Sequence, residues 1–388
     1  MKQFVVPALV AGLLLAACSG DEAPPTTPAE TTPASAAPDA SPTSTPVPTP
    51  SASPTAAAGP GTVDGLAPVE DLSDDELADM AVNEIGRVMV SEWHTIGADA
   101  DGDYANTTET FQAQLQELYD RGYRPVTTRE YRDATFPIPA GTRPVVLTFD
   151  DSTPNHFQWA DDGETPDPDS VVGILEDFAA EHEGWRATAV FAYNWNTPFG
   201  SSEDDEIAAK LQWLVDHGYE LSNHTVSHTS LGDLSDQEVQ DELGDNVDNV
   251  TELVPEATVD TLTLPFGVHP ANDDLALAGT SSDGTSYDHE LVFEVGWMPD
   301  SSPNHVDYEP ESVMRVPAHG PWGAEDIDWW GWLDWLDEDG RAFVSDGDPD
   351  TVTYPEGFTD VAAPPDGVAT RTYEATVDDA SETTSDEG

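Results

Sequence analysis

Apolar runs typical of β-strands alternate with amphipathic helical segments along this chain, and this alternation restricts the folds open to it. We expect strands at 87–90, 145–149, 187–193, 220–222 and 261–264, and helices at 73–86, 110–121, 170–183, 202–217 and after Ser235. Strands that are separated by helices pair in parallel. With about seven such strands, the sequence predicts an α/β fold, a distorted (β/α) barrel that is closed or nearly closed.

Polar residues follow several of the expected strands directly. Asp150 and Asp151 come after the strand at 145–149, and His224 comes after the strand at 220–222. His94 and Pro265 also fall just past expected strands. In (β/α) barrels the active site is built at the carboxyl ends of the strands. The sequence therefore predicts that these residues meet at one rim.

Two adjacent carboxylates and a His-x-x-x-His pair are suited to metal-dependent hydrolysis. Asp151, His224 and His228 together could hold one divalent metal, with a position left open for water and for a carbonyl oxygen. Zinc is the usual ion for such ligands, although other first-row divalent ions also bind them. Asp150 would then be free to accept the proton of the attacking water.

Composition divides the chain of 388 residues into four parts. Residues 1–18 have the pattern of a lipoprotein signal peptide, with Lys2 before a short apolar stretch. Residues 19–68, rich in Pro, Thr, Ser and Ala, lack the large apolar residues needed for a core and read as an extended tether. Residues 69–368 form the expected domain, and 369–388 an acidic disordered tail.

Cys18 is the only cysteine, so a disulfide framework or a thiolate metal site is not possible. The run Leu15-Ala16-Ala17-Cys18 resembles a bacterial lipobox, in which the cysteine is lipidated after cleavage. We therefore expect an extracytoplasmic protein that is anchored to the cell membrane through Cys18. The Cys18→Ser variant should be released in soluble form; membrane association as strong as that of the parent would contradict the anchor.

Acidic residues number 77 against 12 Lys and Arg, which gives a formal net charge of -65. Self-repulsion of this size is tolerated best in concentrated salt, where the Debye length falls to about 3 Å at 1 M. The sequence therefore predicts a halophilic protein. Nucleic acid is not an expected partner, because so few basic side chains are available to neutralise phosphates. No protein partner is indicated.

Three motifs resemble those of polysaccharide deacetylases, the NodB-like carbohydrate esterases. Residues 148–151 are similar to the first motif, with Ser152 where glycine is common, and residues 224–228 to the second. Residues 264–267 resemble the third, but Thr263 stands where the family has the arginine that pairs with the base. The resemblance covers roughly residues 87–316 and implies a NodB-like barrel with Asp150 as the base.

The upstream segments 93–96, 111–115 and 122–126 resemble the branch of this family whose motifs are circularly permuted. That resemblance nominates His94 as the general acid, because the acid of the branch precedes the Asp-Asp motif. It also implies that the third motif, Pro265 and the backbone N–H of Phe266, binds the oxyanion or substrate. Competing candidates for the acid are His319 and, more weakly, His269 and His305.

Arg315 is one of few basic residues and follows an expected late strand. It could orient Asp150 in place of the arginine that is missing at Thr263, or it could be an ordinary surface residue.

The expected function is removal of N-acetyl groups from an extracytoplasmic polysaccharide that contains N-acetylglucosamine. One alternative is a catalytically weakened carbohydrate-binding lipoprotein of the envelope, which the departures at Ser152 and Thr263 keep open. Another is hydrolysis of a different amide or ester, because a metal site fixes a reaction type better than a substrate.

Overall fold

The computed structural model describes residues 72–374, except residues 99, 197, 320–326 and 339. The expected signal peptide with Cys18, the tether and residues 375–388 of the acidic tail lie outside the described part. Among the described residues, the helices are all too short or too polar to cross a membrane.

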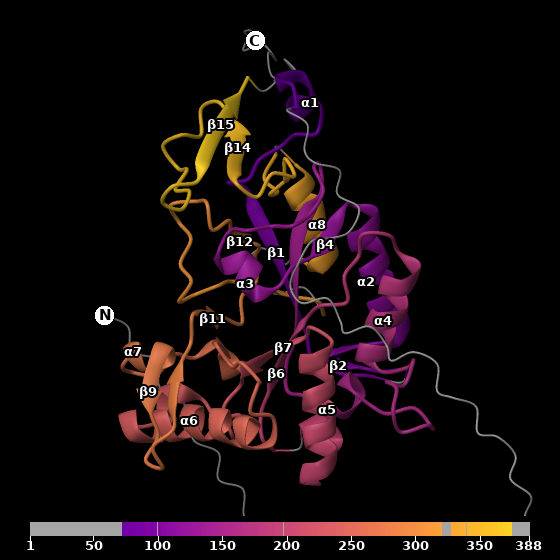
Figure 1. The fold of residues 1–388 in the computed structure, drawn as a ribbon, viewed down its shortest axis with the longest axis vertical. Coiled ribbons are helices and arrows are strands. Elements are labelled where there is room, and N and C mark those ends of the chain that lie inside the picture. Colours follow the sequence, from indigo (N-terminus) through magenta and orange to yellow (C-terminus); the bar gives the residue numbers. More distant parts are fainter. Residues whose placement is uncertain (1–71, 99, 197, 320–326, 339, 375–388) are drawn as a thin grey trace, which may run out of the picture. The chain divides into compact units, whose positions relative to one another are not determined.

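Seven parallel strands form the central sheet, in the order β11-β8-β7-β6-β5-β1-β13 (Figure 1). Their bounds are β1 Arg87–Trp93, β5 Arg143–Phe149, β6 Val190–Tyr193, β7 Glu220–Asn223, β8 Thr261–Thr263, β11 Leu291–Phe293 and β13 Val316–Pro317. Two short strands extend it: β4 (Tyr123–Pro125) pairs with β5, and β12 (Asp300–Ser301) runs antiparallel to β1.

The sheet curls until its two edges almost meet. Val313 bridges to Phe293 of β11, and β13, three residues further on, pairs with β1. The segment 313–317 thus reaches both edges of the sheet. This is the distorted (β/α) barrel of about seven parallel strands that the sequence predicts.

Helices cover the outside of the barrel. The long ones are α2 (Thr108–Asp120), α4 (Val171–Glu181), α5 (Asp204–Asp216), α6 (Asp236–Leu253) and α8 (Trp329–Asp337), and the short ones α1 (Asp74–Asp79), α3 (Thr128–Arg132) and α7 (Asp274–Leu277). Side-chain oxygens cap the N-termini of several, as Thr107 caps α2 and Ser170 caps α4. In Figure 1, α2 and α4 lie along the same side of the sheet.

The alternation of side chains along each strand separates two cores. Met89 and Trp93 of β1 and Leu147 of β5 belong to a large cluster with α2, α4 and α8 on the outside. Val90 and Val146 belong to a second cluster, which fills the barrel interior. On the interior side, the same alternation continues to the polar residues at the strand ends, so it decides which side chains reach the site.

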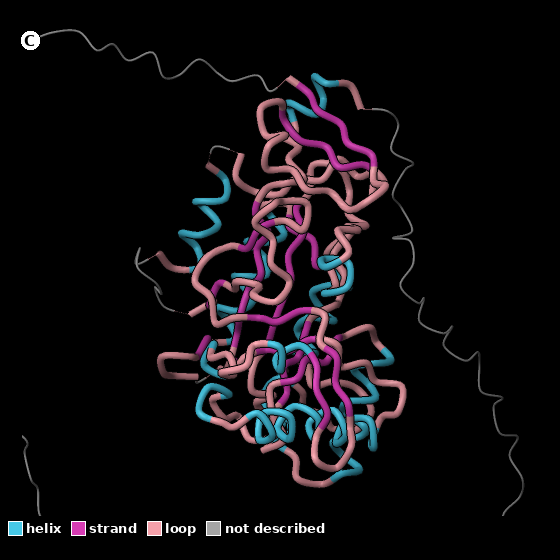
Figure 2. Tube along the Cα trace, turned by 90° about the vertical axis from the view of Figure 1, so that its left-hand side faces the viewer, coloured by secondary structure: helices cyan, strands magenta, loops and turns pink. Residues whose placement is uncertain are grey.

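Two features at the ends of the domain differ from the sequence expectations. The expected helix at 73–86 ends at Asp79, because Ala81 has a left-handed backbone (φ 54°) and Asn83 bridges to Val344. Past the expected domain end at 368, β15 (Ala369–Tyr373) pairs with β14 (Thr351–Pro355). Tyr373 also packs against α1, and Figure 2 shows this strand pair beside that helix. The folded chain therefore continues past residue 368.

The remaining strands are short pairs in the connections. They are β2 (Thr95–Ile96) with β3 (Ala105–Asn106), and β9 (Ala278–Thr280) with β10 (Ser286–Asp288).

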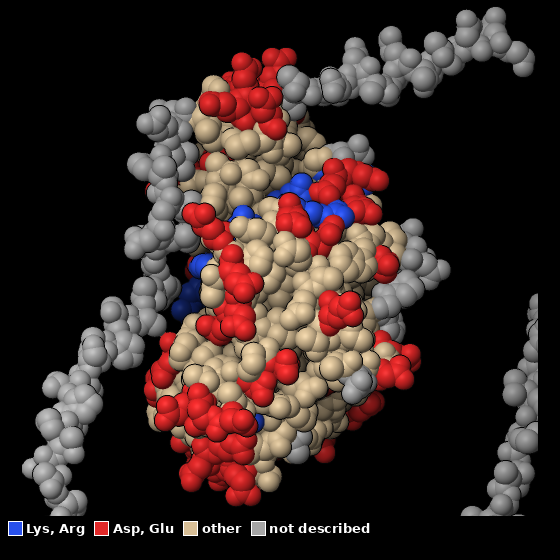
Figure 3. Space-filling view, turned by 90° about the vertical axis from the view of Figure 1, so that its right-hand side faces the viewer, with Lys and Arg blue, Asp and Glu red and all other residues tan. Residues whose placement is uncertain are grey.

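Acidic side chains are spread over the face drawn in Figure 3, and basic ones are few. With a formal net charge of -65, we expect the protein to lose native structure in dilute buffer and to regain it near molar salt. Circular dichroism at increasing salt would measure this. A cooperative melt with the same midpoint at low and high salt would contradict the halophilic interpretation.

Candidate active site

The carboxyl ends of the parallel strands bring the expected site residues together at one rim of the barrel. His94 follows β1, Asp150 follows β5, His224 follows β7 and Pro265 follows β8. Arg315 directly precedes β13, which pairs with the end of β1. His94 and Arg315 therefore share one site although they are 221 positions apart in the sequence.

Asp151, His224 and His228 form a compact group, called the metal group below, whose potential ligand atoms lie within 4.8 Å of one another. One carboxylate oxygen of Asp151 lies 3.4 Å from Nε2 of His224 and 3.1 Å from Nε2 of His228. A tetrahedral metal with bonds of about 2.0–2.1 Å has ligand atoms about 3.3 Å apart. These spacings therefore fit a single divalent ion.

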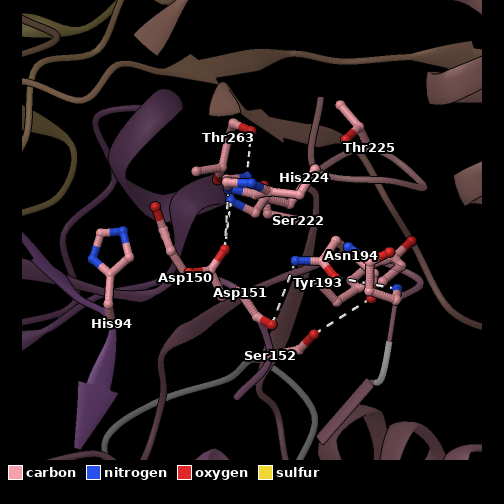
Figure 4. A network of polar contacts seen from close by, with 12 residues as sticks. His94, Asp150, Asp151, Ser152, Tyr193, Asn194, Ser222, His224, Thr225 and Thr263 are labelled. Carbon is pink, nitrogen blue, oxygen red and sulfur yellow. Dashed lines mark hydrogen bonds and ion pairs between the residues drawn. The ribbon is translucent and has the colours of Figure 1, made fainter. Parts of the chain in front are cut away.

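The hydrogen bonding of His224 fits the same reading (Figure 4). Its Nδ1 lies 2.8 Å from the backbone carbonyl of Thr263, which only accepts, so Nδ1 carries the proton. The buried Nε2 then presents a lone pair toward Asp151 and has no hydrogen-bond partner among the described residues. A second hydrogen bond that fixes the tautomer is typical of metal-binding histidines.

Strained backbone gathers at this rim. Asp151, Ser152, Thr225, His228 and Phe266 all have positive φ, between 45° and 73°. Non-glycine residues in this region cost energy and cluster at functional sites. The φ of 45° at Ser152 also gives a physical reason why related sequences would favour glycine at that position.

Asp150 is held by a buried guanidinium. Nη1 and Nη2 of Arg315 donate to Oδ1 and Oδ2 of Asp150, both at 2.8 Å, and Nη1 also donates to Oγ1 of Thr148. Both partners of the ion pair are at most 1 % exposed. Burial alone would raise the pKa of Asp150, but Arg315 outweighs it and holds that pKa below its usual range.

The arginine that contacts Asp150 is therefore Arg315, and Thr263 does not take that place. Oγ1 of Thr263 lies 2.9 Å from Oγ of Ser222. The guanidinium comes instead from the segment that nearly closes the barrel. It is not an ordinary surface arginine.

Glu92 is a site residue that the sequence reasoning missed. Its carboxylate is 1 % exposed, and it lies 3.2 Å from Nη2 of Arg315 and 3.5 Å from Nδ1 of His94. Burial raises the pKa of Glu92 and the charge of Arg315 opposes that rise. The sequence held one signal for this role of Glu92. Positions 92 and 94 are two residues apart in an extended segment, so their side chains lie on the same side of that segment.

Glu92, His94 and Asp150 also place ligand atoms within 4.8 Å of one another. This second group is not a good cation site, because the guanidinium of Arg315 already contacts both carboxylates. Its arrangement links the expected base to the expected acid through one buried ion-pair cluster.

Of the four candidate acids, His94 and His319 lie beside each other. The rings of His94 and His319 are 5.4 Å apart, and His94 is the one grouped with Asp150. His269 pairs with Glu294 at 2.6 Å, and His305 with Asp307 at 3.7 Å. In Figure 4, His94 and His224 lie on opposite sides of Asp150, as expected for an acid across from the metal ligands.

His94 is also anchored through its backbone. Nε2 of the buried His156 lies 2.5 Å from the carbonyl oxygen of His94. Burial lowers the pKa of His156 to about 4, so the ring is neutral and donates through Nε2. This contact fixes the loop that presents the imidazole of His94.

The turn at Pro265–Gly267 brings the third motif to the metal group. Its internal hydrogen bonds run from the N–H groups of Gly267 and Val268 to Leu264 and Pro265. Phe266 has a φ of 60° and its ring, 61 % exposed, lies edge-on to His228 with centroids 4.7 Å apart. The turn is therefore close enough to contact a ligand of the metal group, and its roles at Pro265 and Phe266 stay predictions.

Solved structures that are similar to this chain include two deacetylases and the protein IcaB. The deacetylase PplD of Streptococcus pyogenes, in complex with acetate, is 18 % identical, with a TM-score of 0.46 over 61 % of this chain and 93 % of that one. IcaB of Ammonifex degensii is 15 % identical, with a TM-score of 0.44 over 66 % and 98 %. The polysaccharide deacetylase BC0361 of Bacillus cereus is 16 % identical, with a TM-score of 0.46 over 62 % and 68 %.

No curated protein matches the chain. The family model of polysaccharide deacetylases, in contrast, matches residues 138–282. That segment contains Asp150, Asp151, both metal-group histidines and the turn at Pro265. Over this segment, which carries the candidate site, the chain is similar to the polysaccharide deacetylase family.

Proposed function

We propose that this protein is a metal-dependent hydrolase that removes N-acetyl groups from an extracytoplasmic polysaccharide containing N-acetylglucosamine. The observation that carries the proposal is the pairing of two groups at one rim. Asp151, His224 and His228 form the metal group, and beside them Asp150 and Arg315 form a buried ion pair. An ion and a separate ionised carboxylate are what hydrolysis of an amide requires.

A divalent metal, with zinc as the first choice, would be held by Asp151, His224 and His228. When bound, it would polarise the acetyl carbonyl and lower the pKa of the attacking water.

Asp150 acts as the base in this proposal. Because Arg315 holds its pKa below the usual range, the carboxylate is ionised at neutral pH and ready to take the proton of the water. The bidentate contact with Arg315 also fixes the direction of both oxygens. Asp150 is thereby kept from turning away from the water.

His94 acts as the acid. The oxygen of water joins the acetyl carbon, the carbon–nitrogen bond breaks, and the nitrogen leaves only if it gains a proton. Glu92, at 3.5 Å from Nδ1 of His94, helps to hold the imidazole that gives this proton in place. The backbone N–H of Phe266 is proposed to donate to the oxygen that gains negative charge.

Acetate release tests the proposal. Protein freed of metal with a chelator should release little acetate from N-acetylglucosamine oligomers in concentrated salt, and added zinc should restore the activity. Binding of the oligomers by the zinc-loaded protein without any acetate would favour a carbohydrate-binding protein. Acetate from small esters alone would favour a different hydrolase.

The acid role of His94 has its own test. We expect His94→Ala to bind zinc like the parent and to lose about 10²–10⁴-fold in turnover on an N-acetyl sugar. The loss should be much smaller on an activated acetyl ester, whose leaving group needs no proton. If His94→Ala keeps nearly the parent rate on the sugar and His319→Ala does not, the acid is His319.

The proposed location is outside the cytoplasm, with the domain tethered to the membrane through lipid on Cys18. The sequence of residues 1–68 supports this part of the proposal.

A further inference from the structure

A pocket of about 600 Å³ opens beside the candidate acid. This volume lies within the range of about 300–1,000 Å³ that is common for small-molecule sites. Its walls come from the loop around β3, the first turns of α2, the end of β13 and the start of α8. The described lining includes Asp103, Asn106, Thr107, Thr110, His319, Asp328 and Trp330.

Three rings stand between this pocket and the reacting groups. The centroids of His94, Tyr104 and His319 are 5.1–5.4 Å apart from one another, and His319 also lines the pocket. A ligand in the pocket is therefore about one ring away from His94. This is the position expected for the sugar unit next to the one that is hydrolysed, in the same polymer.

The polar lining is rich in hydrogen-bond acceptors. Asn106 is 5 % exposed and donates to the backbone carbonyl of Ala318, while its buried Oδ1 has no hydrogen-bond partner among the described residues. Oε1 of Gln114 is occupied by the indole N–H of Trp93. The amide oxygen of Asn106 is thus left to a ligand that donates.

The charged side chains in the described lining of the pocket are all acidic. Asp103 and Asp328 contribute carboxylates, and the described lining residues include no Lys or Arg. Burial lowers the pKa of His319 to about 4, so its ring is neutral near pH 7. Trp330 lines the pocket, and the half-exposed ring of Tyr104 lies 5.1 Å from the ring of His319, which also lines it, so aromatic surface of the kind on which sugar rings and cations pack is at hand.

We propose that this pocket binds a glucosamine unit with a free ammonium group, next in the chain to the N-acetylglucosamine unit that is being hydrolysed. The inference rests on the proposed function. Hydroxyl and ammonium donors meet the carboxylates of Asp103 and Asp328 and the free oxygen of Asn106, and an anionic sugar is repelled. Each unit that the enzyme deacetylates becomes a ligand of this pocket for the next one.

The test compares three oligomers of equal length at fixed salt: one fully N-acetylated, one with a single free amine beside an N-acetylated unit, and one with a carboxylate-bearing unit there. For the parent protein, kcat/KM should be highest for the amine oligomer, by about three- to tenfold over the neutral one, as expected for partly exposed ion pairs. It should be lowest for the anionic oligomer.

The paired variant Asp103→Asn/Asp328→Asn should bring the amine-to-neutral ratio of kcat/KM close to one. Asparagine still caps helix α8, where Oδ1 of Asp328 accepts from Gly331, and the single variant Asp103→Asn keeps the test open if α8 is disturbed. The matched control is Asp205→Asn/Asp283→Asn, which removes two exposed charges outside the pocket and should keep the parent ratio.

Equal kcat/KM for the amine and neutral oligomers in the parent would overturn the inference. The inference would also be overturned if the amine-to-neutral ratio of kcat/KM fell as much in the control Asp205→Asn/Asp283→Asn as in Asp103→Asn/Asp328→Asn. These outcomes are distinct from failure of the proposed function. That failure would appear as no acetate from the fully acetylated oligomer by the zinc-loaded parent.

Discussion

Replacing Arg315 by methionine should cost about 3–5 kcal/mol of folding stability, the largest loss that we expect from a single substitution in this protein. Arg315 is fully buried and contacts two buried carboxylates, Asp150 at 2.8 Å and Glu92 at 3.2 Å. Removing the guanidinium leaves both charges in the barrel interior without a cation. Methionine fills much of the volume, so the effect reports mainly on charge.

The pH dependence follows from the direction of the pKa shifts. In the parent, the folded pKa of Asp150 is depressed, so this group contributes stability above its unfolded pKa that is lost as pH falls through the folded value. In Arg315→Met, burial keeps raising the pKa of Asp150 and of Glu92 while the strongest opposing charge is gone, so both pKa values should rise. The variant should therefore lose stability as pH rises through those raised pKa values.

Urea unfolding at several pH values, in concentrated salt, measures this prediction. Arg315→Lys should restore only part of the lost stability. The lysine ammonium supplies a positive charge, but it cannot make the two parallel hydrogen bonds of the guanidinium. Arg129→Met is the matched control: its partner Asp260 is 3.1 Å away, but Arg129 is 58 % exposed, so the cost should be at most about 1 kcal/mol. A similar small cost at Arg315 would show that the buried pair does not stabilise the fold.

Activity offers a second measurement on Arg315→Met. If Asp150 is the base, its raised pKa should move the acid limb of kcat/KM to higher pH, a change that loss of folding alone does not produce. Arg129→Met should leave that limb in place.

The sequence predicted the barrel because the strand-helix alternation is local information. Runs such as 145–149 show their character over five residues, and parallel pairing follows from the helices between them. The rim residues followed as well, since a polar residue after a strand must lie at the carboxyl end. Asp150, Asp151 and His224 were found in this way.

Glu92 was missed because its role depends on tertiary contacts. Within β1 it reads as a polar residue of a strand, and only the folded barrel brings Arg315 beside it. Arg315 itself was noticed because basic residues are rare in this acidic chain. Its contact with Asp150, however, depends on the near-closure of the barrel at Val313. No local pattern encodes that closure.

The helix expected at 73–86 failed for a related reason. Its capping box at Ser73 and Glu76 is present, so the start is local and was predictable. Its end is set by Asn83, which bridges to Val344 across 261 positions. A distant pairing of this kind overrides helix propensity.

The two adjacent aspartates should fail in different ways, which makes them the sharpest test of the site. We expect Asp150→Asn to keep zinc and to lose about 10²–10⁴-fold in turnover, because an amide cannot take a proton from water. Its fold should survive, since Arg315 keeps Glu92 as a partner. Asp151→Asn should instead lose zinc affinity, because a neutral carbonyl replaces a carboxylate ligand.

Backbone strain should not obscure this contrast. Asp151 has a φ of 73°, a region that asparagine tolerates well. Equilibrium dialysis measures zinc affinity, and acetate release at saturating zinc measures turnover. Asp161→Asn, an exposed position in the following loop, is the control and should match the parent in both. The two roles can be separated only if the metal ligand and the base are different residues. Equal loss of zinc affinity in Asp150→Asn and Asp151→Asn would mean that Asp150 also binds the metal. The base would then have to be another residue.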